Sequence, residues 1–147
     1  MNGSRDLPSV GWREWLALPE LGIPRIKVKV DTGARTSAIQ SENVERFRSG
    51  GVDRVRFIVH PLQRDESVAV RIEADLLDMR SVRSSSGVAE ERPTIRTRVV
   101  MGAVEWEIEL TLARRVPMRF RMLLGRTAIR NRFLVDPGRS YLVGTRP

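Results

Sequence analysis

The sequence of 147 residues contains no cysteine and only one histidine, His60. Without cysteine the protein cannot form disulfide bonds, thiolate metal sites or a cysteine nucleophile. A single histidine also excludes a zinc site built on two histidines of the same chain, such as the H-E-x-x-H type. We therefore expect no metal ion at the functional site.

Long apolar runs are absent as well. No stretch approaches the roughly 18 apolar residues that a membrane-spanning helix needs, so the sequence predicts no membrane partner. Residues 1–6 are polar and lack the apolar segment of a signal peptide. The resulting expectation is a soluble, cytoplasmic protein.

Positive charge is abundant, with a formal net charge of +8 that comes almost entirely from arginine, since Lys27 and Lys29 are the only lysines. A basic chain favours an acidic partner, such as nucleic acid, an acidic peptide or an anionic membrane. Aromatic residues make up only 5%, and no basic stretch is interleaved with aromatics that could stack on bases. Because the charges are scattered singly among apolar residues, a solvated surface is the simpler interpretation, and nucleic-acid binding is the least favoured function.

Apolar and charged residues alternate in several short stretches. The clearest is 25–30, where Ile26, Val28 and Val30 alternate with basic residues, as in a half-buried strand. Together with 11–19 it predicts a hairpin. Further strands are predicted at 36–40, 54–60, 67–74, 76–82, 94–101, 104–112, 122–124, 133–136 and 140–143, with a short helix as one interpretation of 41–51 and a helix over 127–132 that begins with Thr127 as N-cap.

These elements predict a small all-β protein. The length suits one domain with its own core, and short strands separated by turns are typical of a barrel or sandwich. Residues 1–9 are polar and contain Pro8, so we expect a flexible N-terminal tail followed by a single domain over 10–147. The serine-rich segment 83–93 predicts a projecting loop or hairpin tip.

One carboxylate follows directly after a predicted strand, in the run Val30-Asp31-Thr32-Gly33-Ala34. A sheet holds such a side chain stiffly, the glycine allows close approach of another backbone, and the threonine can fix the turn. This arrangement suits a catalytic acid. The tripeptide alone, however, favours the simpler role in which Asp31 caps backbone N–H groups.

A second motif lies downstream, where Met122-Leu123-Leu124-Gly125-Arg126 precedes the predicted short helix. Alone it indicates a buried strand and a helix start. A β-rich chain of this length that combines apolar-x-apolar-Asp-Thr-Gly-Ala with Leu-Leu-Gly-Arg resembles the retropepsin-like aspartic peptidases. The resemblance implies a retropepsin-like (acid protease) closed β-barrel with one short C-terminal helix.

Further segments narrow the resemblance to one bacterial family. They are 11–15, 29–37, 59–61, 95–97, 122–128 and 133–137, within a match over roughly residues 10–143. That family is often named ATP-dependent zinc protease and is found near ATP-grasp glutamate ligases that modify a ribosomal protein, so the resemblance implies a ligase or ribosomal protein as partner. This sequence has no zinc ligand set and no G-x-x-x-x-G-K-[ST] phosphate loop. We therefore expect dependence on neither zinc nor ATP, and no cofactor.

The resemblance implies that Asp31 is catalytic. Aspartic peptidases use two carboxylates that share one proton, and this chain holds only one Asp-Thr-Gly. We therefore expect a homodimer in which each copy supplies its Asp31. The resemblance further assigns Thr32, Gly33 and Ala34 to support of the active site, and Arg35, Thr36, Gly125 and Arg126 to substrate or dimer contacts.

Three expectations concern the surroundings of this site. Segment 80–93 is the candidate for the hairpin flap that retroviral enzymes close over their substrate. Retroviral enzymes also carry an acid after Asp-Thr-Gly-Ala that pairs with the arginine of Gly-Arg; residues 35–37 contain none, so Asp136 is the predicted partner of Arg126. Arg35 leads to the hypothesis that acidic peptides are preferred. The alternative to an endopeptidase is a non-catalytic retropepsin-like module that partners a glutamate ligase or ribosomal protein.

Overall fold

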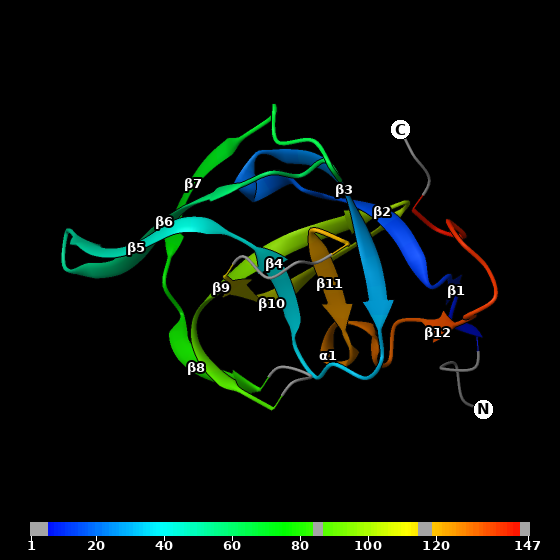
Figure 1. Ribbon diagram of the computed structural model, residues 1–147. Helices are drawn as coiled ribbons and strands as arrows, with labels where there is room; N and C mark the ends of the chain where they lie inside the picture. The colour runs from blue at the N-terminus through cyan, green and yellow to red at the C-terminus, as the bar shows by residue number, and fades with distance from the viewer. Residues whose placement is uncertain (1–5, 84–86, 115–118, 145–147) are drawn as a thin grey trace.

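Extended strands make up most of the protein (Figure 1), as the alternating pattern predicts. The computed structural model describes residues 6–83, 87–114 and 119–144. The strands are β1 (Ser9–Val10), β2 (Arg13–Leu18), β3 (Ile23–Asp31), β4 (Ser37–Gln40), β5 (Glu42–Ser49), β6 (Val52–Val59), β7 (Val70–Asp75), β8 (Asp78–Arg83), β9 (Ala89–Met101), β10 (Val104–Ala113), β11 (Met122–Gly125) and β12 (Leu134–Val135), and the helical segments are the 3-10 turn η2 (Pro19–Leu21) and α1 (Arg126–Ile129).

Six strands form a ring of hydrogen-bonded neighbours. Their order is β10-β4-β11-β3-β2-β9, and β9 pairs again with β10, so the ring closes. Strand β8 adds to β9, while β5, β6 and β7 form a separate antiparallel sheet that projects to one side (Figure 1). The predicted all-β class with one short C-terminal helix is confirmed.

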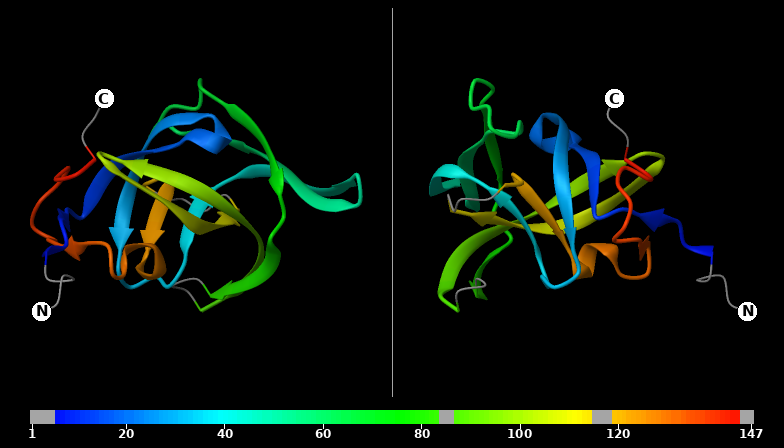
Figure 2. Two further views of the ribbon diagram at one scale, coloured as in Figure 1. Left: turned by 180° about the vertical axis from the view of Figure 1, so that it is seen from behind. Right: turned by 45° about the vertical axis from the view of Figure 1, so that its right-hand side comes forward.

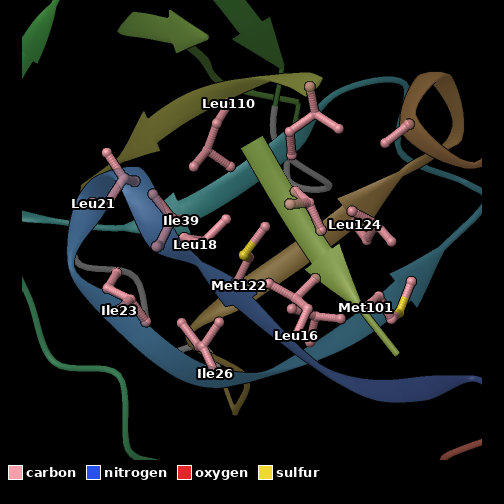
Figure 3. Packing of buried hydrophobic residues seen from close by; sticks show 14 of the residues in the cluster. Leu16, Leu18, Leu21, Ile23, Ile26, Ile39, Met101, Leu110, Met122 and Leu124 are labelled. Carbon is pink, nitrogen blue, oxygen red and sulfur yellow. The ribbon is translucent and has the colours of Figure 1, made fainter. Parts of the chain in front are cut away.

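The core of the ring is built from the inward-facing residues, which alternate with outward-facing ones along the strands (Figure 3). In β3, Ile26 and Val28 are fully buried while the lysines between and after them are not. Met122 and Leu124 of β11 meet them in register, with Met122 opposite Val28. Full burial of one such side chain stabilises the fold by about 1.5–3 kcal/mol. One face of each ring strand is therefore committed to the core, and the opposite face remains at the surface.

The helix considered for 41–51 is wrong, because strand β5 occupies this segment. Glu42 pairs with Ile58 of β6, but the register shifts before Glu45, and Asn43 has a positive φ of 52°. This bulge interrupts the alternation of inward and outward side chains. Because of this interruption, the segment does not show the regular alternation of apolar and polar residues that indicates a strand in a sequence.

The strand predicted at 140–143 is also wrong. Tyr141 has a positive φ of 57°, which breaks the extended conformation. The backbone of the next residues turns instead toward Glu14, a buried acid of β2 whose carboxylate accepts hydrogen bonds from four backbone N–H groups. The donors are Gly11 at 2.6 Å, Leu142 at 2.9 Å, Val143 at 3.1 Å and Gly144 at 2.7 Å. Glu14 therefore fastens the C-terminal segment to the ring.

The ends of the chain differ from expectation in two further respects. Helix α1 is shorter than the predicted 127–132 and begins after Gly125, so Thr127 is not its N-cap. Ser9 pairs with Leu134 in the parallel β1–β12 ladder, so the expected tail over 1–9 reaches into a strand; residues 1–5 lie outside the described part. Within the described ranges, no helix has the length and apolar character needed to cross a membrane.

Candidate active site

The two sequence motifs meet because β11 lies between β3 and β4. It runs parallel to β3, with Gly125 opposite Asp31, and antiparallel to β4, with Leu123 opposite Ala38. The chain leaves β3 at Asp31 and passes the end of β11 before it enters β4 (Figure 1). Asp31-Thr32-Gly33 and Gly125-Arg126 are therefore brought together, as the sequence predicts.

The turn over 31–36 is held by the first residues of α1. The Arg126 N–H donates to the Ala34 carbonyl at 2.7 Å, and the Thr127 N–H donates to the Arg35 carbonyl at 3.1 Å. The Thr127 hydroxyl donates to the same Arg35 carbonyl at 2.9 Å. The first N–H groups of a helix have no partner inside the helix, so the turn and the helix satisfy each other's backbone groups without a side-chain cap.

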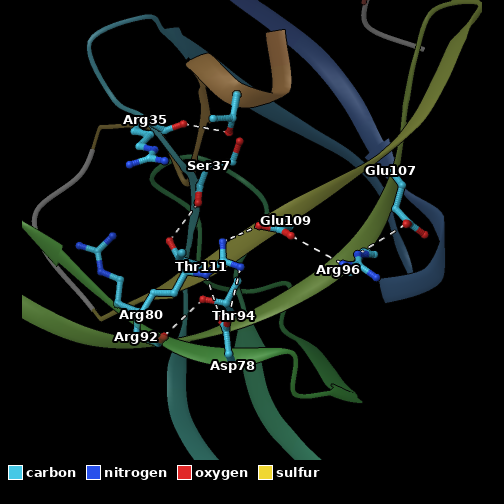
Figure 4. A network of polar contacts seen from close by, with 11 residues as sticks. Arg35, Ser37, Asp78, Arg80, Arg92, Thr94, Arg96, Glu107, Glu109 and Thr111 are labelled. Carbon is cyan, nitrogen blue, oxygen red and sulfur yellow. Dashed lines mark hydrogen bonds and ion pairs between the residues drawn. The ribbon is translucent and has the colours of Figure 1, made fainter. Parts of the chain in front are cut away.

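Gly125 is required by the close approach of this turn. A Cβ atom at Gly125 would lie 2.5 Å from the carbonyl carbon of Thr36, closer than real Cβ contacts. The Gly125 N–H donates to the Ser37 hydroxyl at 3.0 Å, and the Thr111 hydroxyl donates to the Ser37 carbonyl at 2.9 Å (Figure 4). Neighbouring strands thus fix the exit of the turn.

Asp31 itself is partly exposed at the surface of the turn. Its Oδ1 accepts a hydrogen bond from the Gly33 N–H at 3.0 Å, and no other donor among the described residues reaches its carboxylate. Thr32 and Gly33 are exposed and Ala34 is half-buried. The local role is thus the backbone cap that the tripeptide alone favours, and the Oδ2 atom accepts no hydrogen bond from the described residues.

Arg126 does not pair with Asp136, so the predicted ion pair is wrong. Its Nη1 donates to the Thr32 carbonyl at 2.9 Å, whereas Asp136 lies 3.6 Å from the guanidinium of Arg139. A neutral backbone oxygen therefore replaces the missing acid. Arg35 is exposed, its guanidinium pairs with no carboxylate among the described residues, and the neighbouring Thr36 is half-buried.

The predicted flap segment is a β-hairpin. Residues 78–83 of β8 pair with 89–94 of β9, and residues 84–86 lie outside the described part. This hairpin and the 31–36 turn lie at the same end of the molecule in all three views (Figures 1 and 2). Arg80 anchors the hairpin to β10 through a hydrogen bond to Glu109, and this bond holds the pKa of the Glu109 carboxyl below its usual value.

Both ring nitrogens of His60 face hydrogen-bond acceptors of the protein. Its Nε2 lies 3.1 Å from Glu42 Oε2 and its Nδ1 lies 3.2 Å from the Val68 carbonyl. Across the described residues, no three acidic or histidine side chains gather where they could hold a metal ion. The role indicated for His60 is therefore to tie β5 to the loop before β7.

Three supporting residues were missed by the sequence analysis. Ser37 and Thr127 hold the turn through their hydroxyls, yet the sequence indicates only a helix N-cap for Thr127 and no role for Ser37, because serine and threonine are common on strands and helix ends. Glu14 did carry a signal. It occupies an inward position of β2, in phase with Leu16 and Leu18, and an acid on a buried face requires hydrogen-bond partners.

Comparisons with known proteins agree with this geometry. A family model described as RimB-like, retropepsin-like aspartic endopeptidase RimB, matches residues 9–146. Proteins named probable alpha-L-glutamate ligase from Shewanella pealeana and Parasynechococcus marenigrum are 44% and 47% identical over 135 residues. Each match covers 92% of this chain but only 30% and 29% of the relative, so the chain spans less than a third of their length.

The fold also recurs in a solved structure. The crystal structure of a Legionella pneumophila protein of unknown function matches with a TM-score of 0.73, and the match covers 91% of this chain and 96% of that protein. The two sequences are 22% identical, so this likeness shows the shared fold.

Proposed function

The chain belongs to the RimB-like family of retropepsin-like aspartic endopeptidases, and on this premise we propose that it hydrolyses peptide bonds with Asp31 as catalytic residue. The observation that carries the proposal is the position of Asp31 at the end of β3, opposite Gly125, partly exposed and with one hydrogen-bond donor to its carboxylate among the described residues. The sheet and α1 fix the backbone on both sides of it. A carboxylate held this stiffly, with so few partners of its own, is suited to act on a second molecule.

The active form that we propose is a homodimer. The described part of the chain offers no second Asp-Thr-Gly, so the other carboxylate of the pair comes from the partner's Asp31. Thr32 and Gly33 are exposed beside Asp31 and are free to meet the partner. The lack of a side chain at Gly33 lets the two turns approach closely.

The chemistry follows from the pair of carboxylates. One ionised Asp31 takes a proton from a water molecule, whose oxygen attacks the peptide carbonyl carbon. The other Asp31, protonated, gives its proton to the carbonyl oxygen, so that a neutral tetrahedral intermediate forms. The Asp31 that took the proton from water gives it to the nitrogen as the carbon–nitrogen bond breaks. The other Asp31 takes a proton from one hydroxyl of the intermediate, so that the new carboxyl group and the amine leave and the pair again holds one proton. The acid and base roles belong to the pair rather than to either residue.

We propose acidic peptides as preferred substrates. Arg35 is exposed without a carboxylate partner among the described residues, and Arg126 donates a hydrogen bond from Nη1 to the Thr32 carbonyl. Cations beside the open carboxylate favour an anionic chain. Acidic peptides should therefore be cleaved faster than neutral peptides of equal length. Equal rates would remove this preference from the proposal.

The test of the proposed activity is Asp31→Asn with Asp136→Asn as matched control. Both aspartates accept a hydrogen bond at 3.0 Å from the N–H of a glycine two residues later. The two variants therefore change the same kind of turn at two different places. We expect Asp31→Asn to lose at least about a hundredfold in peptide cleavage with its thermal stability kept, and Asp136→Asn to cleave like the unmodified protein. If Asp31→Asn cleaves as fast as the unmodified protein, Asp31 is not the catalytic residue. If the unmodified protein cleaves no peptide, the non-catalytic interaction module replaces the peptidase.

We further propose that the protein works with a glutamate ligase, and that a ribosomal protein is its target. The support is that relatives named probable alpha-L-glutamate ligase carry a stretch matching 92% of this chain within a much longer protein. A defined mixture of the protein and a purified ligase tests the partnership by calorimetry. Measurable binding supports it, and no heat at any concentration contradicts it.

A further inference from the structure

The outer face of the β2–β3 hairpin collects four cations and three aromatic rings. Arg13 of β2 lies opposite Lys29 of β3, and Trp15 lies opposite Lys27. The intervening residues of both strands point into the core. We call this surface the cationic face; its cations are Arg13, Arg25, Lys27 and Lys29, and its aromatic rings are Trp12, Trp15 and Tyr141.

Cations and rings of this face are in direct contact. The Arg13 guanidinium lies 4.6 Å from the centre of the Trp12 ring and 5.0 Å from that of Tyr141. Arg25 lies 5.8 Å and Lys27 5.3 Å from the Trp15 ring. Such contacts hold flexible cationic side chains against a flat surface. None of these three rings is fully buried.

Within the described part of the chain, the four cations of this face lack acidic partners, whereas most arginines on the other strand surfaces have them, with Arg46 and Arg71 of the three-stranded sheet as exceptions. On β9 and β10, Arg96 and Arg98 pair with glutamates, and on the three-stranded sheet Arg48, Arg54 and Arg56 pair with acids. Among the described residues, no carboxylate pairs with Arg13, Arg25, Lys27 or Lys29. Glu14 is the acid nearest in sequence to Arg13, but it is buried and held by four N–H groups. The positive charge of this face is therefore uncompensated.

We propose that the cationic face binds single-stranded nucleic acid. Residues on one side of a strand repeat every ~6.7 Å, so Arg25, Lys27 and Lys29 form a row that successive phosphates of an extended strand can follow. Half-exposed rings beside such a row are the platform on which unpaired bases stack. An acidic peptide would use the charges but not the rings, and a duplex would keep its bases stacked away from them.

The sequence did not reveal this surface because its parts come from three segments: Trp12, Arg13 and Trp15 from one, Arg25, Lys27 and Lys29 from the next, and Tyr141 from the far end of the chain. Tyr141 reaches Arg13 because its N–H donates to the Arg13 carbonyl at 3.0 Å and because Glu14 holds the next residues beside β2. Most of the contacts between basic and aromatic residues on this face therefore form across segments that lie apart in the chain. This inference stands apart from the proposed peptidase activity, since it uses a different surface and a different ligand.

The test measures the anisotropy of a fluorescein-labelled oligouridylate of about twelve nucleotides, a length within the usual site size, at several NaCl concentrations. With four phosphates contacted, log K should fall with log salt at a slope of about −2.8. The double variant Arg25→Glu/Lys27→Glu should have a slope of about −1.4. Trp15→Leu should weaken binding about tenfold or more with little change of slope.

The matched control is Arg46→Glu/Arg71→Glu, which changes the net charge equally at exposed positions of the three-stranded sheet. Its slope should stay near that of the unmodified protein. Equal loss in both double variants would overturn the proposal, because net charge alone would then explain binding. The proposal also fails if the unmodified protein does not bind the oligonucleotide at low salt, or if an oligoglutamate peptide displaces it at equal concentration.

Discussion

At the scale of single residues, two carboxylates of this protein stand in opposite environments. Glu14 is fully buried and accepts four backbone N–H groups, whereas Asp31 is partly exposed and accepts one. A buried carboxylate with all its lone pairs engaged is fixed to a structural role. An exposed one held only by its own turn remains open to a substrate and to a second carboxylate.

Replacement of Glu14 should therefore cost stability. Glu14→Gln keeps the size of the side chain but puts an NH₂ group against N–H donors, so at least one buried donor loses its partner. We expect the free energy of unfolding to fall by about 2–4 kcal/mol, measured by urea titration. Glu20→Gln is the control, since Glu20 is exposed and accepts only the Arg98 N–H. A loss no larger than that of the control would contradict the role given to Glu14.

Gly125 should tolerate no side chain. In Gly125→Ala the new Cβ would collide with the Thr36 backbone, so the turn that carries Asp31 must move. We expect a loss of about 1–3 kcal/mol in stability together with a loss of peptide cleavage. At Gly138 the nearest atom would lie 3.5 Å from a Cβ, so Gly138→Ala should change neither property. Full activity in Gly125→Ala would show that the turn adapts.

The residue scale also shows what the sequence allowed to be predicted. Asp31, Gly125 and Arg126 are predicted from two motifs of the chain, and β11 places Gly125 opposite Asp31; their role in catalysis stays a prediction. The carbonyl partner of Arg126 could not be predicted, since any backbone oxygen can accept a hydrogen bond whatever its residue type.

At the scale of elements, the β8–β9 hairpin is the part most directly tied to the proposed substrate site. It is anchored at its base, where Arg80 of β8 contacts Asp78 and Glu109. Its position at the same end as the 31–36 turn supports the proposal that it acts as the flap (Figure 2). The anchor should then limit how far the hairpin opens.

Loss of this anchor should loosen the hairpin in a pH-dependent way. Because the pKa of Glu109 is lowered by its hydrogen bond from Arg80, the pair stabilises the fold above the ordinary glutamate pKa. That contribution is lost as the pH falls through the lowered pKa. Both side chains are partly exposed, so Glu109→Gln should cost only about 0.2–1 kcal/mol at pH 7, and nothing at a pH well below the lowered pKa.

Hydrogen exchange of the β8 amides measures the same effect locally. Exchange should be faster in Glu109→Gln than in the unmodified protein at pH 7. Glu91→Gln serves as control, because Glu91 also lies in the hairpin but pairs with no cation among the described residues. Equal exchange in all three proteins would contradict the anchor.

Elements were predictable where the alternation of residues was uninterrupted. Strands β3 and β10 follow it and were found close to their observed limits. Strand β5 was hidden by its bulge at Asn43, and the irregular segment after Gly138 was taken for a strand. Both errors arise from backbone conformations that side-chain patterns do not encode.

At the scale of the whole molecule, charge is distributed unevenly over the surface. Among the described residues, the strand surface of β9–β10 holds arginines paired with acids, and the three-stranded sheet holds both paired arginines and the unpaired Arg46 and Arg71, while on the cationic face all four cations are unpaired. Exposed ion pairs contribute little stability, but the acids that form them leave the charge of the cationic face uncompensated. The net charge of +8 alone did not show this division.

The central claim is that two copies of Asp31 form one active site. Its most direct test mixes the unmodified protein with Asp31→Asn at constant total concentration, allows the subunits to exchange, and measures peptide cleavage. If each site needs both carboxylates, activity follows the square of the unmodified fraction, so an equal mixture retains about a quarter of the activity. A linear decline, with about half the activity retained, would mean that each copy works alone and would contradict the account.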